Sequence, residues 1–405
     1  MRVLFLTSHF PYPPHSGGAL RAFGLMRGAA EAGHSLSLLC FAANPPQNTP
    51  LHEWCEAITI VPPPVRQLKD RLRDLALTAQ PDMGRRFWSE AMVEALRKLL
   101  AERTFDLVHA ESLEMAAYLP LIHDWYPQLP LIYGSLNAEA DLQRTMFSTD
   151  RRNPHRLIGA AYSWVQWRRL TRFEGHICNI SAHVLAVSEP DRVLLQKLAQ
   201  TPVTVVENGI DIAPYLQMPR NQAFGEQTIV FTGTMDYRPN VDAVMWFSEA
   251  ILPAIVAKFP HVRFYVVGQR PHARLEPLRE NPHIVITGAV PEIAPYLQGA
   301  QVYIAPLRMG SGTRFKLLEA MAAGCGVVST EIGAQGLGVQ SGQEMLIADT
   351  PVDFANCVNN LLTDASRRKE IGEAARQFVQ THFDWSAIVP RLLDVYARLE
   401  KSQTL

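Results

Sequence analysis

The stretch from Val302 to Thr330, VYIAPLRMGSGTRFKLLEAMAAGCGVVST, constrains the fold more than any other part of the sequence. Its apolar run from Val302 to Leu307 predicts a buried parallel strand, and a GSG turn follows at 310–312. A helical pattern beginning at about Thr313 ends before a second predicted strand, Val327 to Thr330. The stretch is therefore a strand, loop, helix and strand unit.

The loop and the helix start in this unit have the chemistry of an anion site. Gly310 and Gly312 let the backbone approach a ligand closely, and the free N–H groups of the helix start attract negative charge. Lys316 and Glu319 lie three residues apart and share one helix face, which suits a phosphate and a sugar hydroxyl of a nucleotide diphosphate. Short glycine loops are weak motifs, so the alternative is a plain turn and a solvated ion pair.

The amino-terminal part predicts the same architecture. A strand from Arg2 to Ser8 precedes a loop that ends in Gly17 and Gly18, a helix from Ala19 to Ala32 follows, and Ser35 to Phe41 is the next strand. This order is typical of a doubly wound sheet, in which ligands bind at the carboxyl ends of the strands. Gly17 and Gly18 are placed to let the backbone approach a diphosphate or a sugar, with a tight turn as the alternative.

Polar residues lie at the ends of two further predicted strands, and a glycine lies at the end of a third. His109 and Glu111 lie at the end of the strand from Phe105, and Asn137 and Glu139 follow the strand Leu131 to Gly134 within SLNAEA. Gly233 ends the strand that opens the second half of the chain. A lone histidine at such a rim is more often a satisfied structural residue than a catalyst.

The segment GSGTRFKLLEAMAAGCGVVST resembles the donor-binding segment of the retaining GT-B glycosyltransferases of the family-4 type. SHFPYPPHSGGALRAF, VVENGID and FTGTMDYRPNVDAVMWF agree with it, and their order and spacing match that family over nearly the whole length. The resemblance implies an α/β GT-B fold, with two doubly wound Rossmann-like domains facing each other across a cleft. It implies transfer of a sugar with retention, without a metal, from a nucleotide diphosphate sugar to a carbohydrate or lipid-linked acceptor in cell-surface polysaccharide or glycan synthesis.

Position at a predicted strand end marks His109 and Glu111 as candidates, and the resemblance marks Asn137 and Glu139. The catalytic candidates are His109, Glu111, Asn137 and Glu139. The donor-binding candidates are Gly17, Gly18, Gly233, Arg238, Gly310, Gly312, Thr313, Arg314, Lys316 and Glu319. Thr234 and Pro239 stand where an arginine and a lysine are common, and Gly312 stands where a glutamate is common. We therefore expect diphosphate binding to depend on Lys316 with Arg314 or Arg238.

We expect four parts along the chain. They are an acceptor-side domain over 1–211, a linker over 212–227, a nucleotide-sugar-binding domain over 228–382 and a last helix over 383–405 that crosses back to the first domain. Thr145 to Ile180, rich in arginine and aromatic residues, predicts one long helix at the sheet edge.

The composition limits the kinds of partner that the chain can be expected to bind. A chain of 405 residues with 47% hydrophobic and 19% charged residues predicts a globular protein of at least two domains. The net charge of −1 gives no general attraction to nucleic acid, and we expect no cofactor. The five scattered cysteines predict buried thiols in a reducing compartment, and the lack of a DxD motif predicts no metal-bridged donor.

The start of the chain and the longest apolar runs predict a cytoplasmic location. MRVLFLTSHF leads into a proline and glycine loop, as a first strand does, and we expect no bilayer-spanning stretch of about 20 apolar residues. Arg66, Lys69, Arg71 and Arg73 could face an anionic acceptor or a membrane surface, so peripheral membrane contact stays open. Nearby aspartates favour a solvated helix face instead.

Three other functions have to be weighed. A nicotinamide oxidoreductase is disfavoured because the GxGxxG fingerprint with its acidic partner is missing. A GT-B nucleotide-sugar epimerase would need other site residues. A non-catalytic scaffold that binds a nucleotide sugar is the more serious alternative, because of the departures at Gly312, Thr234 and Pro239.

Overall fold

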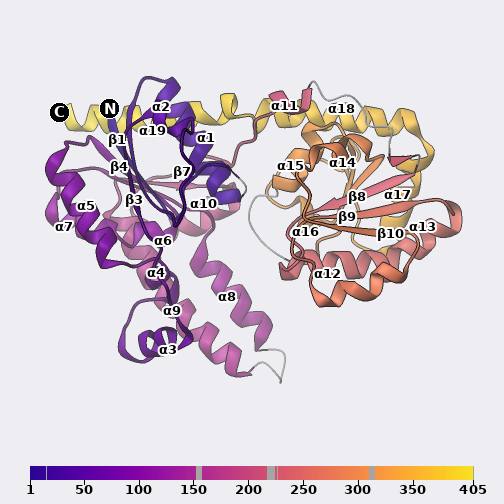
Figure 1. Cartoon of the computed structure of the whole chain (residues 1–405), viewed down its shortest axis with the longest axis horizontal. Helices are drawn as coiled ribbons and strands as arrows, with labels where there is room; N and C mark the ends of the chain where they lie inside the picture. The colour runs from indigo at the N-terminus through magenta and orange to yellow at the C-terminus, as the bar shows by residue number, and fades with distance from the viewer. Residues whose placement is uncertain (15, 152–156, 217–223, 226, 310–314, 405) are drawn as a thin grey trace. The chain divides into compact units, whose positions relative to one another are not determined.

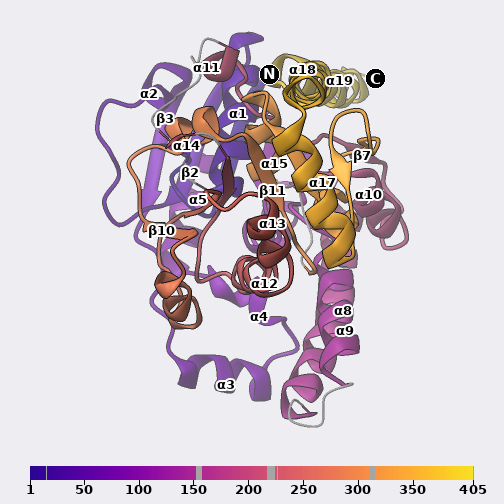
Figure 2. The same cartoon turned by 90° about the vertical axis from the view of Figure 1, so that its right-hand side faces the viewer.

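The computed structural model describes residues 1–14, 16–151, 157–216, 224–225, 227–309 and 315–404. The chain forms two compact units, which Figures 1 and 2 show from two directions. Unit 1 comprises Met1–Gly209 together with Ile388–Leu405, and unit 2 comprises Ile210–Ala387. Each unit has its own sheet and its own core.

Unit 1 is built on a seven-stranded sheet in the order β3-β2-β1-β4-β5-β6-β7, with every pair parallel. Parallel strands with helices on both faces are apolar throughout, and β1, RVLFLT, is buried at every residue after the first. The strands are β1 (Arg2–Thr7), β2 (Ser35–Phe41), β3 (Cys55–Val61), β4 (Leu107–Glu111), β5 (Leu131–Gly134), β6 (His183–Ala186) and β7 (Val203–Val205).

The helices of unit 1 cover this sheet and also extend beyond it. In both views α8 and α9 run side by side and project past the sheet, with α3 near their far end. The helices are α1 (Gly17–Glu31), α2 (Leu51–Trp54), α3 (Leu68–Leu77), α4 (Asp82–Arg86), α5 (Glu90–Glu102), α6 (Leu113–Ala116), α7 (Leu119–Trp125), α8 (Glu139–Asp150), α9 (Leu157–Ile180), α10 (Glu189–Gln196) and α19 (Trp385–Thr404), of which α19 belongs to unit 1 from Ile388.

The prediction of one long helix over 145–180 was wrong, because two helices occupy this region. Helix α8 ends at Asp150 and α9 begins at Leu157. The sequence between them contains Pro154, and a proline in a helix interior removes one N–H donor and clashes with the preceding turn. The arginines and aromatic residues of the region lie mostly on α9.

Unit 2 is built on a six-stranded parallel sheet in the order β10-β9-β8-β11-β12-β13. Alternate residues of β8 face opposite sides: Ile229 and Phe231 enter one core and Val230 enters the other. The strands are β8 (Thr228–Thr232), β9 (Arg263–Val267), β10 (Ile284–Gly288), β11 (Val302–Ala305), β12 (Gly326–Ser329) and β13 (Leu346–Ile347).

Helices lie on both faces of this second sheet, with α12 and α13 on one side and α14 and α15 on the other (Figure 1). The helical elements of unit 2 are α11 (Ala213–Leu216), α12 (Arg238–Trp246), the π-helix η3 (Phe247–Ile251), α13 (Leu252–Lys258), the 3₁₀ helix η4 (Ala273–Glu280), α14 (Ala294–Gly299), α15 (Phe315–Ala322), α16 (Glu331–Ala334), α17 (Pro351–Thr363) and α18 (Ala365–His382).

The expectation about bilayer-spanning stretches needs a correction. Among the described residues, the continuous helical stretch Arg238–Lys258 is long and apolar enough to cross a membrane. Half of its most apolar window is buried inside the protein, where Val244, Phe247 and Ile251 belong to the core. In the sequence, Asp242 and Glu249 interrupt the apolar run of this stretch. The packing is that of a core helix.

The strand orders define where ligands can bind. In unit 1 the order reverses between β1 and β4, and in unit 2 it reverses between β8 and β11. At such a reversal the connections from neighbouring strands leave in opposite directions, which opens a crevice at the carboxyl ends of the strands. The candidate sites lie at these two reversals.

Candidate functional site

Lys316 is the central polar residue of the unit 2 site. It lies in the first turns of α15, and its Nζ donates a hydrogen bond of 2.6 Å to Oδ1 of Asn240, near the start of α12. Asn240 Nδ2 donates to the carbonyl of Thr234 at 2.9 Å, which turns the amide oxygen toward the lysine. The ammonium also lies 4.4 Å from the centroid of the Phe231 ring of β8. Three elements thus hold one positive charge at the end of β8.

Two glycines make this close approach possible. Gly233 has φ of 151°, and a Cβ there would lie 2.7 Å from both Lys316 Nζ and Asn240 Nδ2. Gly268, after β9, has φ of 154°, and a Cβ there would lie 1.7 Å from the carbonyl oxygen of Gly233. A Cβ at Gly268 would require the backbone to move, and a Cβ at Gly233 would displace the Lys316 and Asn240 side chains. Gly233, a donor-binding candidate at the end of β8, therefore borders the lysine, whereas Gly268 was not among the candidates.

Glu319 lies one turn beyond Lys316 and accepts a hydrogen bond of 3.5 Å from the hydroxyl of Tyr215, on α11. Burial raises the pKa of Glu319 to about 7, although the Tyr215 hydroxyl and the Lys316 charge both oppose this rise. The carboxyl group is therefore partly ionised at neutral pH and can accept hydrogen bonds from a hydroxylated ligand. Tyr215 and Asn240 are site residues that sequence reasoning missed, and no local pattern distinguishes them.

The other donor-binding candidates of unit 2 are placed as follows. Arg238 is the first residue of α12 and is exposed, so its guanidinium is accessible. Gly310, Gly312, Thr313 and Arg314 lie outside the described residues.

The unit 1 site lies at the reversal between β1 and β4. Helix α1 begins at Gly17, and its N-cap residue Ser16 accepts a hydrogen bond from the Ala19 N–H at 3.3 Å. A cavity of about 40 Å³ lies before this helix start, and its lining includes His9, Gly18, Glu111 and Ser112. The sequence predicted Gly18 and Glu111 at one rim, and the fold brings them together because β1 and β4 are neighbours.

Glu111 is held in a buried ion pair below this cavity. Its Oε2 accepts a hydrogen bond of 3.0 Å from Nε of Arg21, which is 0% exposed. Burial acts to raise the pKa of Glu111, but the charge of Arg21 and the contact with His109 outweigh it and lower the pKa to about 2. A carboxylate in this position stays ionised throughout the physiological range.

His109 lies deeper than the sequence suggested. Its ring is 0% exposed, its Nδ1 lies 2.8 Å from the hydroxyl of Tyr396 on α19, and it stacks on Phe5. Its Nε2 lies 2.8 Å from Glu111 Oε1, although the angles are not those of a hydrogen bond. The histidine therefore supports Glu111 from beneath and has no access to a ligand in this structure.

Arg21 connects the ion pair to the end of unit 1. It also donates hydrogen bonds to the carbonyl oxygens of Val206 and Glu207 and to Oδ1 of Asn208, at distances of 2.7 to 3.2 Å. Asn208 opens the NGID segment, at the last residues of the main part of unit 1. Arg21 was not predicted, because nothing in the pattern of α1 marks it as a buried charge.

Asn137 and Glu139 form a separate polar cluster after β5. Asn137 Nδ2 donates to Glu139 Oε1 at 3.1 Å, and burial raises the pKa of Glu139 to about 8. Beside them the buried Glu174 of α9 accepts hydrogen bonds from the N–H groups of Glu139 and Ala140, at the start of α8. Much of Glu139 is thus in the protonated form at neutral pH, and a protonated carboxyl can donate a proton or a hydrogen bond.

The remaining candidate ligands of the described residues are the thiols and the groups of acidic and histidine side chains. Cys40, Cys178 and Cys325 are buried thiols that form no disulfide, and burial raises the pKa of Cys40 to about 12. Among the residues that the structure describes, no group of three or more His, Cys, Asp or Glu side chains is placed to hold a metal ion.

Two doubly wound parallel sheets, each with polar residues gathered at its strand-order reversal, define a pair of Rossmann-like ligand-binding units. The profile of Glycosyltransferase Family 4 matches residues 15–213, and that of Glycosyl transferases group 1 matches residues 226–364. The chain belongs to these GT-B glycosyltransferases of the family-4 type.

Individual relatives are distant. The phosphatidyl-myo-inositol mannosyltransferase of Mycolicibacterium smegmatis is 28% identical over 52% of this chain and 56% of its own length. An uncharacterised 44.6 kDa protein in the cps region of Klebsiella pneumoniae is 27% identical over 38% of this chain and 42% of its own length. The matched region thus spans about half the length of these relatives. A glycogen synthase of Mycobacterium tuberculosis is 24% identical across 100% of this chain and 96% of its own.

Solved structures of glycosyltransferases have the same fold. Sucrose-phosphate synthase from Thermosynechococcus elongatus superimposes with a TM-score of 0.72 at 16% identity, covering 99% of this chain and 100% of that one. Anabaena HepE in complex with UDP superimposes with a TM-score of 0.69 at 16% identity, covering 98% and 100%. At these identities the likeness establishes the fold alone.

Proposed function

We propose that this glycosyltransferase moves a sugar, with retention, from a nucleotide diphosphate sugar to a carbohydrate or lipid-linked acceptor. The observation that carries the proposal is the Lys316 cluster at the end of β8, where the ammonium, Asn240 and a glycine-lined backbone converge beside Glu319. The complexes of Anabaena HepE with UDP and with UDP-glucose support a nucleotide sugar donor.

The chemistry follows from charge development in the transition state. The sugar gains positive charge while the leaving diphosphate gains negative charge, so fixed donors aimed at the diphosphate lower the barrier. Lys316 supplies an ammonium, and Arg238 at the exposed start of α12 supplies a second cation near the positions where Thr234 and Pro239 replace basic residues. Glu319 accepts hydrogen bonds from the ribose hydroxyls. The proposal needs neither a metal ion nor a cofactor.

The acceptor side is assigned to unit 1. Glu111 offers a permanent carboxylate beside the Gly17 and Gly18 helix start, and Glu139 offers a protonated carboxyl. A role in cell-surface polysaccharide or glycan synthesis is supported by the cps-region relative and by the structural neighbour WaaG, titled as involved in lipopolysaccharide biosynthesis. We place the enzyme in the cytoplasm, with peripheral contact at the inner membrane face and no nucleic-acid partner.

The alternative is a scaffold that binds a nucleotide sugar without transferring it. The replacement of a common glutamate by Gly312 and of common basic residues by Thr234 and Pro239 favours it. An epimerase of the same fold is a weaker alternative.

The test is incubation of the purified chain with a panel of sugar nucleotides and acceptors, with release of nucleoside diphosphate as the readout. Transfer predicts release that depends on the acceptor, and the anomeric proton coupling of the product in NMR reports retention or inversion. Donor binding in calorimetry without any release would favour the scaffold. If no sugar nucleotide binds, both the transferase and the scaffold proposals are wrong.

A further inference from the structure

Unit 1 has a second cavity, of about 330 Å³, beside α3 and α4, which we call the arginine pocket. Its volume lies within the range of about 300–1,000 Å³ that is usual for small-molecule sites. Three arginines and one aspartate give its wall a formal excess of two positive charges. The wall consists of Pro64, Arg66, Arg71, Asp82, Arg86 and Phe87.

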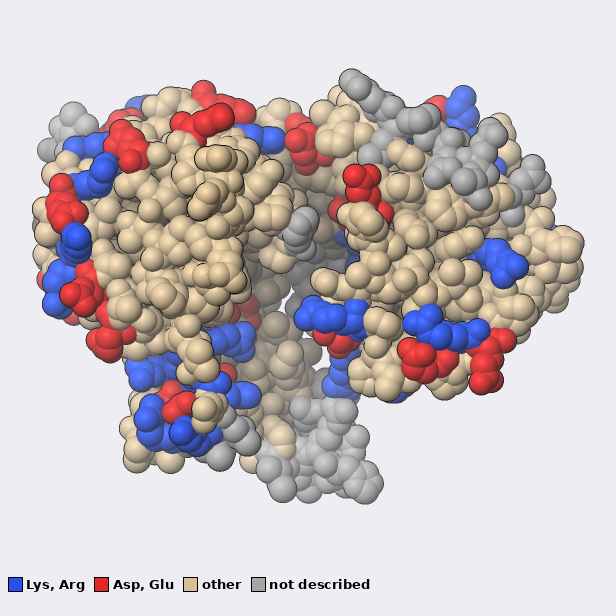
Figure 3. All heavy atoms as spheres, viewed as in Figure 1, with Lys and Arg blue, Asp and Glu red and all other residues tan. Residues whose placement is uncertain are grey.

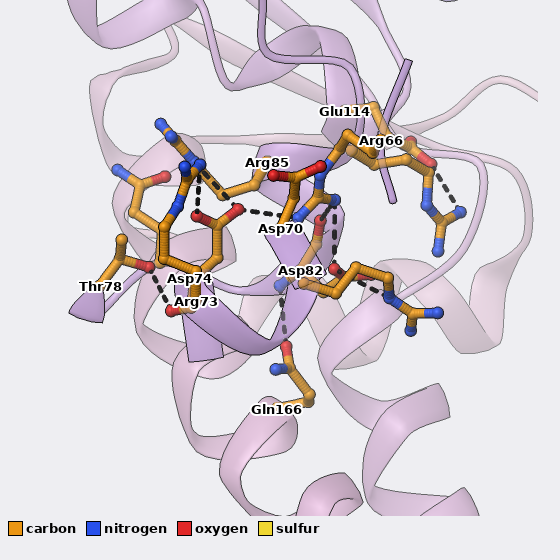
Figure 4. Close-up of polar contacts among 12 residues, drawn as sticks. Arg66, Asp70, Arg73, Asp74, Thr78, Asp82, Arg85, Glu114 and Gln166 are labelled. Atoms are coloured by element: carbon orange, nitrogen blue, oxygen red, sulfur yellow. Dashed lines mark hydrogen bonds and ion pairs between the residues drawn. The ribbon is translucent and has the colours of Figure 1, made fainter. Parts of the chain in front are cut away.

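Arg66 is the structural frame of the arginine pocket. Its two guanidinium arms donate to Asp74 Oδ2 at 2.8 Å and to Asp82 Oδ1 at 3.1 Å, and its side chain is only 16% exposed. Figure 4 shows Arg66 lying toward both carboxylates. Gln166 of α9 accepts a hydrogen bond of 2.8 Å from the N–H of Asp82, which ties α4 to the long helix. The shortest contacts of Asp74 and Asp82 with an arginine are therefore those with Arg66.

Arg71 and Arg86 keep much of their hydrogen-bonding capacity. Arg71 Nε lies 3.5 Å from Asp82, its NH2 lies 3.4 Å from the Tyr162 hydroxyl, and its side chain is 49% exposed. Arg86 NH1 lies 3.5 Å from Glu114, and its side chain is 51% exposed. Each guanidinium carries five N–H donors in a planar fork, and these long contacts use few of them. Figure 3 shows basic side chains gathered at this end of unit 1.

The arginine pocket adjoins the carboxyl edge of the sheet. The Phe87 ring lies edge-on to the ring of His9, with centroids 5.3 Å apart, and His9 lines the cavity that also contains Gly18. Glu114, the partner of Arg86, lies in α6, which directly follows β4. A molecule in the arginine pocket would therefore lie next to the cavity at the β1 and β4 reversal.

We propose that the arginine pocket binds the phosphate or diphosphate ester group of the acceptor. A phosphate monoester carries a charge of about −1.5 to −2 at pH 7 and three acceptor oxygens, which matches the excess charge and the two available forks. Phe87 and Pro64 supply an apolar wall for the group attached to the phosphate. This inference rests on the proposed function, because it names the class of the acceptor.

The experiment is calorimetric titration of the full chain, without any sugar nucleotide, with three probes. Geranyl phosphate represents a lipid phosphate, glucose 1-phosphate represents a soluble sugar phosphate, and glucuronic acid represents a carboxylate. Tighter binding of geranyl phosphate assigns a lipid-linked acceptor, and tighter binding of glucose 1-phosphate assigns a soluble one. Glucuronic acid binding as tightly as both phosphates would overturn the assignment to phosphate.

Variants locate the binding. The double variant Arg71→Gln and Arg86→Gln should weaken phosphate binding by about 10- to 100-fold, since each lost contact is charge-assisted. Arg103→Gln is the matched control, because Arg103 is also a half-exposed arginine of unit 1 that lies 3.6 Å from one glutamate. Lys316→Ala should leave this binding unchanged, which separates the arginine pocket from the donor site. Equal affinities of the double variant and the wild type would refute the proposal, whatever the donor assay gives.

Discussion

The buried pair of Arg21 and Glu111 allows one prediction to be worked through quantitatively. Replacing Glu111 by Gln leaves Arg21, which is 0% exposed, with carbonyl and amide oxygens but without a compensating charge. Removing one partner of a buried ion pair costs about 3–5 kcal/mol. The pKa of Glu111 falls from 4.5 to about 2. At 1.36 kcal/mol per pKa unit, this shift independently gives the ionised carboxylate a contribution of about 3 kcal/mol to the free energy of unfolding.

The sign of the pH dependence follows from the lowered pKa. The ionised carboxylate is the favoured form in the folded chain, so its contribution is fully present above the unfolded pKa of 4.5 and is lost as pH falls through about 2. Urea unfolding of the wild type and of Glu111→Gln, each measured between pH 7 and pH 2.5, checks this. The difference in unfolding free energy between the two proteins should lose most of its value as the pH falls across this range.

Two controls make the test specific. Glu56→Gln removes an exposed partner of Arg103 in the same unit and should cost less than about 1 kcal/mol. A second variant, Arg21→Met combined with Glu111→Gln, leaves no uncompensated charge and should cost less than the sum of the two single changes. A cost below about 1 kcal/mol for Glu111→Gln, or strict additivity in the double variant, would refute the argument.

Three further outcomes are expected. Lys316→Ala should weaken nucleoside diphosphate binding by about 10- to 100-fold, because a charge-assisted contact is lost. The control Lys369→Ala, at an exposed lysine, should leave this binding unchanged. Equal affinities of Lys316→Ala and the wild type in calorimetry would contradict the donor site. Gly268→Ala should destabilise unit 2 by about 3 kcal/mol or more, since its Cβ would lie 1.7 Å from a carbonyl oxygen. Gly159→Ala, with nothing within 4 Å of the new Cβ, should stabilise helix α9 by about 0.5–1 kcal/mol. The same shift in melting temperature for both variants would exclude the steric explanation. Donor affinity should fall as pH drops through about 7, because protonated Glu319 no longer accepts two hydroxyl hydrogen bonds. In Glu319→Gln the donor affinity should not change with pH. If it changes as in the wild type, another group titrates.

The order of elements was accessible from the sequence, because it depends on local periodicity. Apolar runs of four to seven residues followed by helical patterns predicted the parallel strands, and the bounds of β2 and β5 agree with those predicted. Glycine and proline predicted the turns. Lys316 and Glu319 were predicted on one helix face, and spacing alone is enough for that conclusion.

The partners of these residues were decided only by the tertiary structure. Asn240 and Lys316 are 76 residues apart, and Arg21 and Glu111 are 90 residues apart, so no local pattern connects them. Burial is equally non-local: His109 follows the pattern of a rim residue, yet helix α19 places the Tyr396 hydroxyl against it and closes it off from solvent. Sequence determines which way a side chain leaves its own strand or helix, whereas the desolvation and charge that set its chemistry come from segments folded against it.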